Sequence, residues 1–253
     1  MTQALSGRRV LVTRPREQSE NLARLVREAG GEPVCVPAIE ILPLADPAPF
    51  RALAERLASF DLAIFVSRNA VRSALDLLGG KPWPPALKVA TVGQGSREEL
   101  ESRGLTGVIA PAARSDSEAL LARPELAEVR GRRIVIFRGD AGRQLLGDEL
   151  GKRGAIVEYA ACYRRVRPAG DDLPALWARG VDAVALSSAE GLANIIEMLG
   201  AGAPPMLAAV PLFVPHERVA REAARRGLTR VIVAGPRDTE MAAALVAYFV
   251  GAG

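Results

Sequence analysis

The residues best suited to chemistry in this sequence lie where predicted strands end and predicted helices begin. These turns are rich in hydroxyls, glycines and arginines and fall at 13–15 (Thr-Arg-Pro), 67–69 (Ser-Arg-Asn), 93–96 (Gly-Gln-Gly-Ser), 138–140 (Arg-Gly-Asp), 187–188 (Ser-Ser) and 215–217 (Pro-His-Glu). Helix N-termini carry unpaired N–H groups and partial positive charge, so each turn could contribute roughly 0.3 to 1 kcal/mol to binding an anion. A ligand with many carboxylates would use many turns at once.

The same residues also have purely structural interpretations. Ser67 and Ser188 stand where helix N-caps are expected, and serine is a favoured cap. Arg14 and Arg138 could simply end their strands as solvated charges. His216 is the only histidine, and its place in a turn that starts with proline favours a solvated loop residue over a catalyst.

Several common chemistries are disfavoured by what the sequence lacks. A Ser-His-Asp triad could use only His216. Cys35 and Cys162 form no Cys-x-x-Cys or Cys/His cluster, which disfavours a disulfide framework and structural zinc. The glycines of 93–95 lack the third glycine of a dinucleotide fingerprint, and 138–143 lacks the Gly-Lys-[Ser/Thr] of a P-loop. We therefore predict no cofactor and no metal.

The net charge and the hydropathy of the sequence limit which partners and which cellular compartment are expected. The net charge of +4 is mild, and no basic tail or basic stripe with interleaved aromatics is present, so we expect no nucleic-acid partner. The longest apolar runs, such as 62–66, are far shorter than the roughly 20 residues of a membrane span, and no signal-peptide pattern precedes them. We expect a cytoplasmic protein that binds an acidic small molecule away from membranes.

Strand signals alternate with helix signals along the whole chain. This predicts an α/β fold of parallel sheets with helices on both faces. Each half holds five expected strands, at 10–13, 33–36, 62–66, 89–92 and 108–110, and at 134–137, 156–159, 183–186, 212–214 and 231–233. Helices are expected to end near 30 and 153, to open at a capping box over 115–118 (Ser-x-x-Glu), whose serine lies outside the residues described below, and to cover 50–59, 69–78, 97–102, 190–199, 218–226 and 239–249. The strand count favours flavodoxin-like doubly wound sheets of order 2-1-3-4-5, which bind ligands beyond the carboxyl ends of their strands.

The two halves of the chain also repeat one another. The opening stretch 7–40 returns, 124 positions later, within 131–165, and both copies begin Gly-Arg-Arg. Shorter blocks return in the same order, 61–67 at 182–188, 103–109 at 226–232 and 116–118 at 238–240. A period this long predicts two domains of one type rather than a solenoid. Periodicity alone permits either consecutive halves, 1–130 and 131–253, or domains that exchange segments.

Six short motifs span nearly the whole chain in a fixed order, at 10–15, 65–71, 91–93, 151–164, 187–192 and 224–228. In this order, and with the internal repeat, the chain resembles the uroporphyrinogen-III synthase family. The resemblance implies duplicated flavodoxin-like five-stranded sheets, exchanged between two domains joined by a two-segment linker. One domain would be 1–37 plus 168–253, and the other 38–167.

The resemblance also implies an activity. The family's enzymes are cyclising hydro-lyases that close hydroxymethylbilane into uroporphyrinogen III, inverting ring D and releasing water, in tetrapyrrole (haem, sirohaem, cobalamin) biosynthesis. No cofactor is implied. A monomer is expected, with room for a transient hand-over of substrate from hydroxymethylbilane synthase. The alternative is a non-enzymatic two-domain binder or sensor of an acidic small metabolite.

Site residues follow from the same resemblance. Tyr163 matches the family's functional tyrosine, and a phenol in water stays protonated at neutral pH and can protonate a leaving hydroxide. Its alternative interpretation is an amphipathic linker residue. The expected contacts of the substrate carboxylates are Arg14, Ser67, Gly93, Ser96, Arg138, Gly139 and Ser188. At 214–217 the sequence Val-Pro-His-Glu departs from the glycine and small hydroxyl of many relatives, which puts contacts at that turn in doubt.

Overall fold

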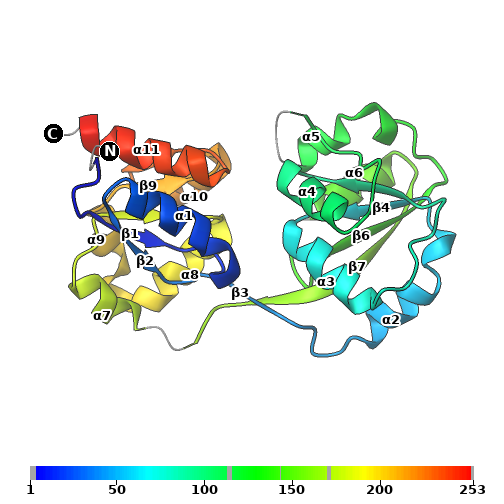
Figure 1. Ribbon diagram of the computed structural model, residues 1–253, viewed down its shortest axis with the longest axis horizontal. Coiled ribbons are helices and arrows are strands. Elements are labelled where there is room, and N and C mark those ends of the chain that lie inside the picture. Colours follow the sequence, from blue (N-terminus) through cyan, green and yellow to red (C-terminus); the bar gives the residue numbers. More distant parts are fainter. Residues whose placement is uncertain (1–3, 113–115, 143, 170–171, 252–253) are drawn as a thin grey trace. The chain divides into compact units, whose positions relative to one another are not determined.

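Two five-stranded sheets organise the chain (Figure 1). The computed structural model describes residues 4–112, 116–142, 144–169 and 172–251. The chain divides into unit 1, residues 1–40 with 166–253, and unit 2, residues 41–165. Every strand pair whose register is described is parallel. The predicted α/β class, with two parallel-dominated five-stranded sheets, is confirmed.

Unit 1 contains the sheet of order β10-β9-β8-β1-β2. Its elements are β1 (Arg9–Val12), α1 (Arg16–Glu28), β2 (Glu32–Cys35), α7 (Leu173–Ala178), β8 (Ala183–Ala185), α8 (Ala189–Leu199), η3 (Gly200–Gly202), α9 (Ala203–Ala208), β9 (Leu212–Val214), α10 (Glu217–Arg225), β10 (Val231–Val233) and α11 (Asp238–Gly251). The opening strand-helix-strand of the chain thus shares its sheet with the last three strands.

Unit 2 contains the sheet of order β3-β7-β6-β4-β5. Its elements are β3 (Glu40–Leu42, at the unit boundary), α2 (Ala48–Glu55), η1 (Leu57–Ser59), β4 (Leu62–Phe65), α3 (Arg68–Leu78), β5 (Lys88–Thr91), α4 (Gln94–Ser102), α5 (Ser117–Leu121), η2 (Pro124–Leu126), β6 (Arg133–Gly139), α6 (Leu145–Lys152) and β7 (Ile156–Val166). No helix within the described ranges of either unit is long and apolar enough to cross a membrane.

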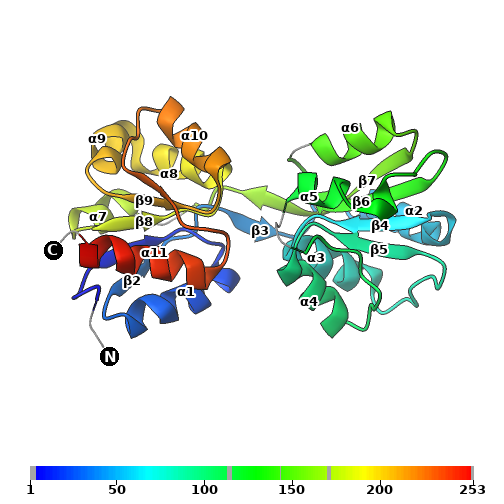
Figure 2. The ribbon, with the colours of Figure 1, turned by 90° about the horizontal axis from the view of Figure 1, so that it is seen from above.

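Each sheet buries both of its faces, because successive strand residues point to opposite sides. In unit 1, Leu11 packs with α8 and α10, whereas Val10 and Val12 pack with α1 and α11. Figure 2 shows α1 and α11 side by side over that second face. In unit 2, Phe65 faces the helices α3 and α4, and Ile64 faces α5 and α6. Packing on both faces holds the carboxyl ends of the strands together at one edge of each sheet.

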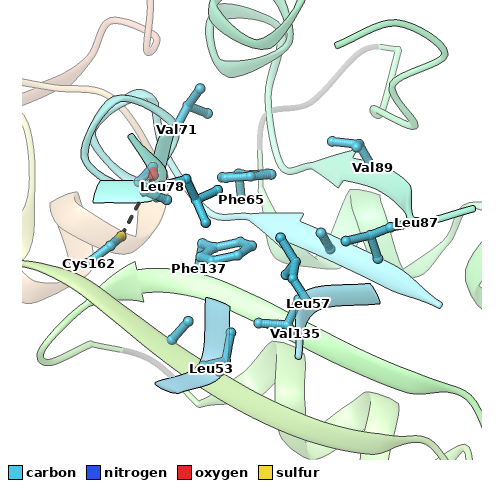
Figure 3. Packing of buried hydrophobic residues seen from close by; sticks show 14 of the residues in the cluster. Leu53, Leu57, Phe65, Val71, Leu78, Leu87, Val89, Val135, Phe137 and Cys162 are labelled. Atoms are coloured by element: carbon cyan, nitrogen blue, oxygen red, sulfur yellow. Dashed lines mark hydrogen bonds between the residues drawn. The ribbon is translucent and has the colours of Figure 1, made fainter. Parts of the chain in front are cut away.

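Phe65 and Phe137 form the centre of the larger core of unit 2 (Figure 3). Their rings stack with centroids 4.7 Å apart, and both side chains are fully buried. Cys162 closes the same cluster, and its thiol donates to the carbonyls of Arg138 (3.1 Å) and Ala70 (3.7 Å). Burial raises the pKa of this thiol to about 12, so Cys162 stays neutral at physiological pH. This core fixes β4 and β6 immediately behind the candidate site.

Three details differ from the sequence expectation. Residues 108–110 were expected as a strand but form only a bridge between Ala90 and Ile109, because Pro111 follows and cannot donate to a ladder. The fifth strand of that sheet is β3 instead. The strand expected at 156–159 continues to Val166 and stays paired with β6 past a register shift at Arg138/Gly139. The short helices α7 and α9 are additional to the expected set.

Candidate functional site at the strand ends

Tyr163 lies inside unit 2, near the end of β7. Its side chain is 2% exposed and belongs to the core cluster with Phe65 and Phe137. The sequence also allowed a linker residue at this position, and in the structure the backbone of β7 stays paired with β6 as far as Gly139, which lies opposite Tyr163. The ring is therefore held by the sheet rather than by a flexible segment.

Ser67 and Gly139 surround this tyrosine. The phenol oxygen lies 3.3 Å from Ser67 Oγ. A Cβ at Gly139 would come within 3.0 Å of Tyr163 Cε2 and 3.2 Å of Cζ, so the absence of a side chain there is what lets the ring lie flat against the backbone. Tyr163 of β7 is thus brought close to two other predicted site residues, Ser67 in the turn after β4 and Gly139 of β6.

Ser67 and Ser188 both act as helix N-caps, so the structural interpretation of these serines is confirmed. Ser67 Oγ accepts from the N–H of Ala70 at 3.1 Å, and Ser188 Oγ accepts from the N–H of Gly191 at 2.9 Å. Both serines are partly exposed at the carboxyl ends of β4 and β8. A cap of this kind leaves the serine hydroxyl proton available to another acceptor.

Gly93 and Ser96 lie at the start of α4, beyond β5. Gly93 is the N-cap residue in an extended conformation, and Ser96 is buried in the first turn. The side chain of Arg68 lies across this turn, since a Cβ at Gly95 would be 3.4 Å from Arg68 Nε. Thr91 Oγ1 donates to the carbonyl of Phe65 at 2.8 Å and ties the ends of β5 and β4 together. The turns at 67–69 and 93–96 therefore lie next to each other.

Arg138 is a buried arginine, 9% exposed, at the end of β6. The alternative interpretation of a solvated strand-ending charge does not hold for this residue, because its guanidinium lies 4.9 Å from the ring centroid of Tyr159. Arg165 lies in the same area: its guanidinium is 5.9 Å from the Tyr163 ring centroid. A Cβ at Gly142 would be 2.9 Å from Arg138 Nη2 and 3.6 Å from Arg165 Nη2, so two cationic groups approach one loop. Positive charge so placed favours a carboxylate.

Arg14 lies at the end of β1 in unit 1, and it too is not a solvated charge. It pairs with Asp238 at 2.7 Å and donates to the carbonyl of Pro236 at 3.1 Å. His216 is the N-cap residue of α10, beyond β9. The pKa of Glu240 is lowered mainly by hydrogen bonds from Arg237, with a smaller contribution from His216. The strand ends of unit 1 are thus already rich in paired charges.

Arg68 and Arg165 are the contributors that the sequence interpretation did not select. Arg165 follows Tyr163 by two residues, so strand alternation places both on one face of β7. The spacing is visible in the sequence, but it could be interpreted only once β7 was known to run to Val166. Among the described residues no group of three or more His, Cys, Asp or Glu is arranged to hold a metal ion.

Comparison with known proteins agrees with this architecture. The family model described as uroporphyrinogen-III synthase HemD matches residues 20–244. The uroporphyrinogen-III synthases of Salmonella typhimurium and Escherichia coli are each 32% identical over 240 residues, covering 91% of this chain and 96% of theirs.

Two solved structures show the same fold at lower identity. A mutant uroporphyrinogen III synthase from Thermus thermophilus superposes with a TM-score of 0.67 at 20% identity, covering 98% of this chain and all of the other. The enzyme from Helicobacter pylori gives 0.62 at 12% identity, covering 95% of this chain and 99% of the other. Because the family model and these close relatives match along most of its length, the chain belongs to the uroporphyrinogen-III synthase family.

Proposed function

We propose that this chain closes hydroxymethylbilane into uroporphyrinogen III, with loss of water and inversion of ring D. The observation that carries the proposal is the family match over residues 20–244, together with relatives of that name aligned to 91% of the chain. The enzyme would be a hydro-lyase of tetrapyrrole biosynthesis that needs no cofactor.

The fold detail that accompanies this function is duplication with exchange. Two aspartates support it, because each links the starts of two neighbouring strands of its sheet in the same way. Asp182 accepts from the N–H of Arg9 at 2.8 Å, and Asp61 accepts from the N–H of Arg133 at 2.7 Å. In each pair the aspartate N–H donates back to the arginine carbonyl at 2.8 Å. Equivalent contacts at equivalent repeat positions favour two copies of one flavodoxin-like fold.

The domain limits would be 1–37 plus 168–253 and 38–167, joined by two linker segments. The division of the chain near residues 40 and 165 supports this arrangement. So does the pairing of β3 with β7, together with the hydrogen bond from Arg164 Nε to the carbonyl of Pro43 at 3.0 Å. These contacts support two linker segments that run side by side.

Binding would rest on the turns at the carboxyl ends of the strands. The helix N-termini after Ser67, Gly93 and Ser188 offer backbone donors to carboxylates, and the guanidinium groups of Arg14 and Arg138 add positive charge. Gly139 and Ser96 complete the expected contacts. Holding a flexible linear tetrapyrrole so that its two ends meet is catalysis by proximity and orientation.

The chemistry would start with departure of the substrate's hydroxyl group. A proton from Tyr163 makes that oxygen a better leaving group, since it can then depart as water. The electron-poor azafulvene that remains is attacked by the substituted carbon of ring D. The resulting spiro intermediate fragments and recloses with ring D inverted. Every bond change takes place within the substrate, so the protein supplies position and a proton.

Incubation of the purified chain with hydroxymethylbilane, followed by separation of the product isomers, tests the proposal. Isomer III is expected with the protein, and isomer I alone in a protein-free control. Isomer I alone in both would contradict the proposal and leave the non-enzymatic binder of an acidic metabolite.

We also propose a cytoplasmic monomer that has no nucleic-acid or membrane partner and receives its substrate from hydroxymethylbilane synthase. Sedimentation with and without that enzyme would test the monomer and the hand-over.

A further inference from the structure

The burial of Tyr163 raises a question about how its proton reaches a substrate. The side chain is 2% exposed and sits in a core cluster of aromatic and aliphatic residues. Within the described part of the chain, the one polar side-chain atom at hydrogen-bonding distance from the phenol is Ser67 Oγ. We infer that Ser67 passes the proton of Tyr163 to the leaving hydroxyl of the substrate, an inference that rests on the proposed function.

Ser67 is well placed to be the outer member of this pair. It is partly exposed at the carboxyl end of β4, whereas the tyrosine behind it is covered. Its Oγ accepts one hydrogen bond from the N–H of Ala70 at 3.1 Å, which fixes the oxygen and leaves its own proton to be donated. The separation of 3.3 Å from the phenol oxygen is longer than a typical O–H···O bond, and such contacts commonly tighten when substrate binds.

The tyrosine ring cannot readily turn outward to reach the substrate itself. It lies against the backbone at Gly139, where a Cβ would come within 3.0 Å of the ring. The guanidinium of Arg165 stands 5.9 Å from the ring centroid, and the backbone N–H of Asp140 donates to the Tyr163 carbonyl at 2.9 Å. Packing in a dense core resists the loss of these contacts. A serine between the ring and the solvent removes the need for such a motion.

The step balances as two coupled proton transfers. The C–O bond of the substrate's hydroxymethyl group breaks with both electrons going to oxygen, and that oxygen takes the Ser67 proton and leaves as water. Ser67 Oγ takes the Tyr163 proton, which leaves a phenolate, and the pyrrole nitrogen lone pair supplies electrons to the carbon. The proton released when the ring finally closes restores the phenol. The N-terminus of α3 at Ser67 favours the transient negative charge.

Two other roles for Ser67 make different predictions. As a contact for a substrate carboxylate, it would affect the Michaelis constant and act independently of Tyr163. As a helix cap alone, it would affect folding and not turnover. A relay requires that both hydroxyls act in one step. Removing the second hydroxyl after the first should therefore lower kcat little further.

The test compares Ser67→Ala, Ser67→Thr, Tyr163→Phe and the double variant Ser67→Ala/Tyr163→Phe in formation of isomer III. We expect each hydroxyl-deleting single variant to lower kcat by about 10²-fold or more with little change in KM. The double variant should match the slower single variant. Ser67→Thr should retain most of the activity, because it keeps the hydroxyl and its extended backbone suits a β-branched residue.

A matched control is Asp172→Ala, which removes the N-cap of α7, where Asp172 Oδ1 accepts from the N–H of Ala175 at 3.0 Å, and should leave kcat unchanged. Circular dichroism would verify that every variant is folded. Multiplicative losses in the double variant, a change confined to KM, or full activity of Ser67→Ala would each overturn the relay. If the unaltered chain made no isomer III, the proposed function would fail, and the relay with it.

Discussion

Arg14 and Asp238 form an ion pair of 2.7 Å in which each side chain keeps 13% of its surface exposed. The pair joins the turn after β1 to the first turn of α11, and Asn21 Nδ2 adds a hydrogen bond of 2.7 Å to the same carboxylate. Water screens such a pair less than one on the open surface. A substrate carboxylate that uses Arg14 must therefore compete with Asp238.

Asp238→Asn should free the charge of Arg14. We expect the free energy of unfolding to fall by about 1 to 3 kcal/mol, because a largely covered arginine loses its partner. The KM for hydroxymethylbilane should fall at the same time if Arg14 contacts the substrate. Glu28→Gln is the control: its pair with Arg24 is about half exposed, and we expect a loss below roughly 0.5 kcal/mol. A higher KM for Asp238→Asn would argue against substrate binding by Arg14.

Gly139→Ala should disturb the tyrosine without breaking the fold. The added Cβ would lie 3.0 Å from Tyr163 Cε2, so the ring must shift, and misplacing a catalytic group by about 1 Å can cost on the order of 10²-fold in rate. Steady-state kinetics would measure the loss. In Gly151→Ala no atom outside the adjoining residues and backbone of α6 lies within 4 Å of the new Cβ, and this change should leave turnover intact and stabilise by about 0.5 to 1 kcal/mol. Equal kinetics for the two variants would contradict the proposed packing role.

Asp61→Ala and Asp182→Ala should behave alike if the two sheets are copies of one fold. Each change removes a carboxylate that accepts from the N–H of an arginine at the start of the neighbouring strand, with distances of 2.7 and 2.8 Å. We expect each to cost about 1 kcal/mol in urea unfolding. Asp76→Ala, which breaks only an exposed pair with Arg103, should cost less. If one substitution lowered the free energy of unfolding strongly and the other had no effect, the two sheets would not be equivalent.

Glu99 should contribute stability that depends on pH. A hydrogen bond from Arg72 at 2.8 Å is the main cause that holds the pKa of Glu99 below its ordinary value of 4.5. Because the folded pKa is depressed, the stabilisation is present above pH 4.5 and is lost as the pH falls through the folded value. The difference in unfolding free energy between the unaltered chain and Glu99→Gln should therefore shrink on acidification. A difference that stayed constant from pH 7 to pH 3 would contradict this linkage.

Local patterns explain why much of the architecture was predictable. The alternation of strand and helix signals follows from apolar periodicity, and it identified β1, β4, β8 and β9 because short buried runs are typical of parallel sheets. Ser67 and Ser188 were predicted as caps because a serine before a helix satisfies an orphan N–H within three residues. The internal repeat was visible as identical residues at a fixed separation.

Long-range contacts could not be read in the same way. Strand alternation cannot say that residues 108–110 stop at one bridge while the segment near Glu40 joins the sheet edge beside β7. Nor could it show that Arg14 meets Asp238, which lies more than 200 positions away in the chain. Pairing partners of this kind depend on which strands become neighbours.

The sequence by itself determined the α/β class, the internal repeat of residues and the capping serines, because each is encoded by residue type and short or regular spacing, whereas the candidate tyrosine came from the family resemblance. Only the tertiary structure decided that Tyr163 is covered, that Gly139 makes room for its ring, and that Ser67 stands 3.3 Å from its hydroxyl. The physical reason is that burial and hydrogen-bond partnership are properties of packed neighbours. Those neighbours come from β6, β7 and the turn after β4, which the chain brings together only when the sheet forms.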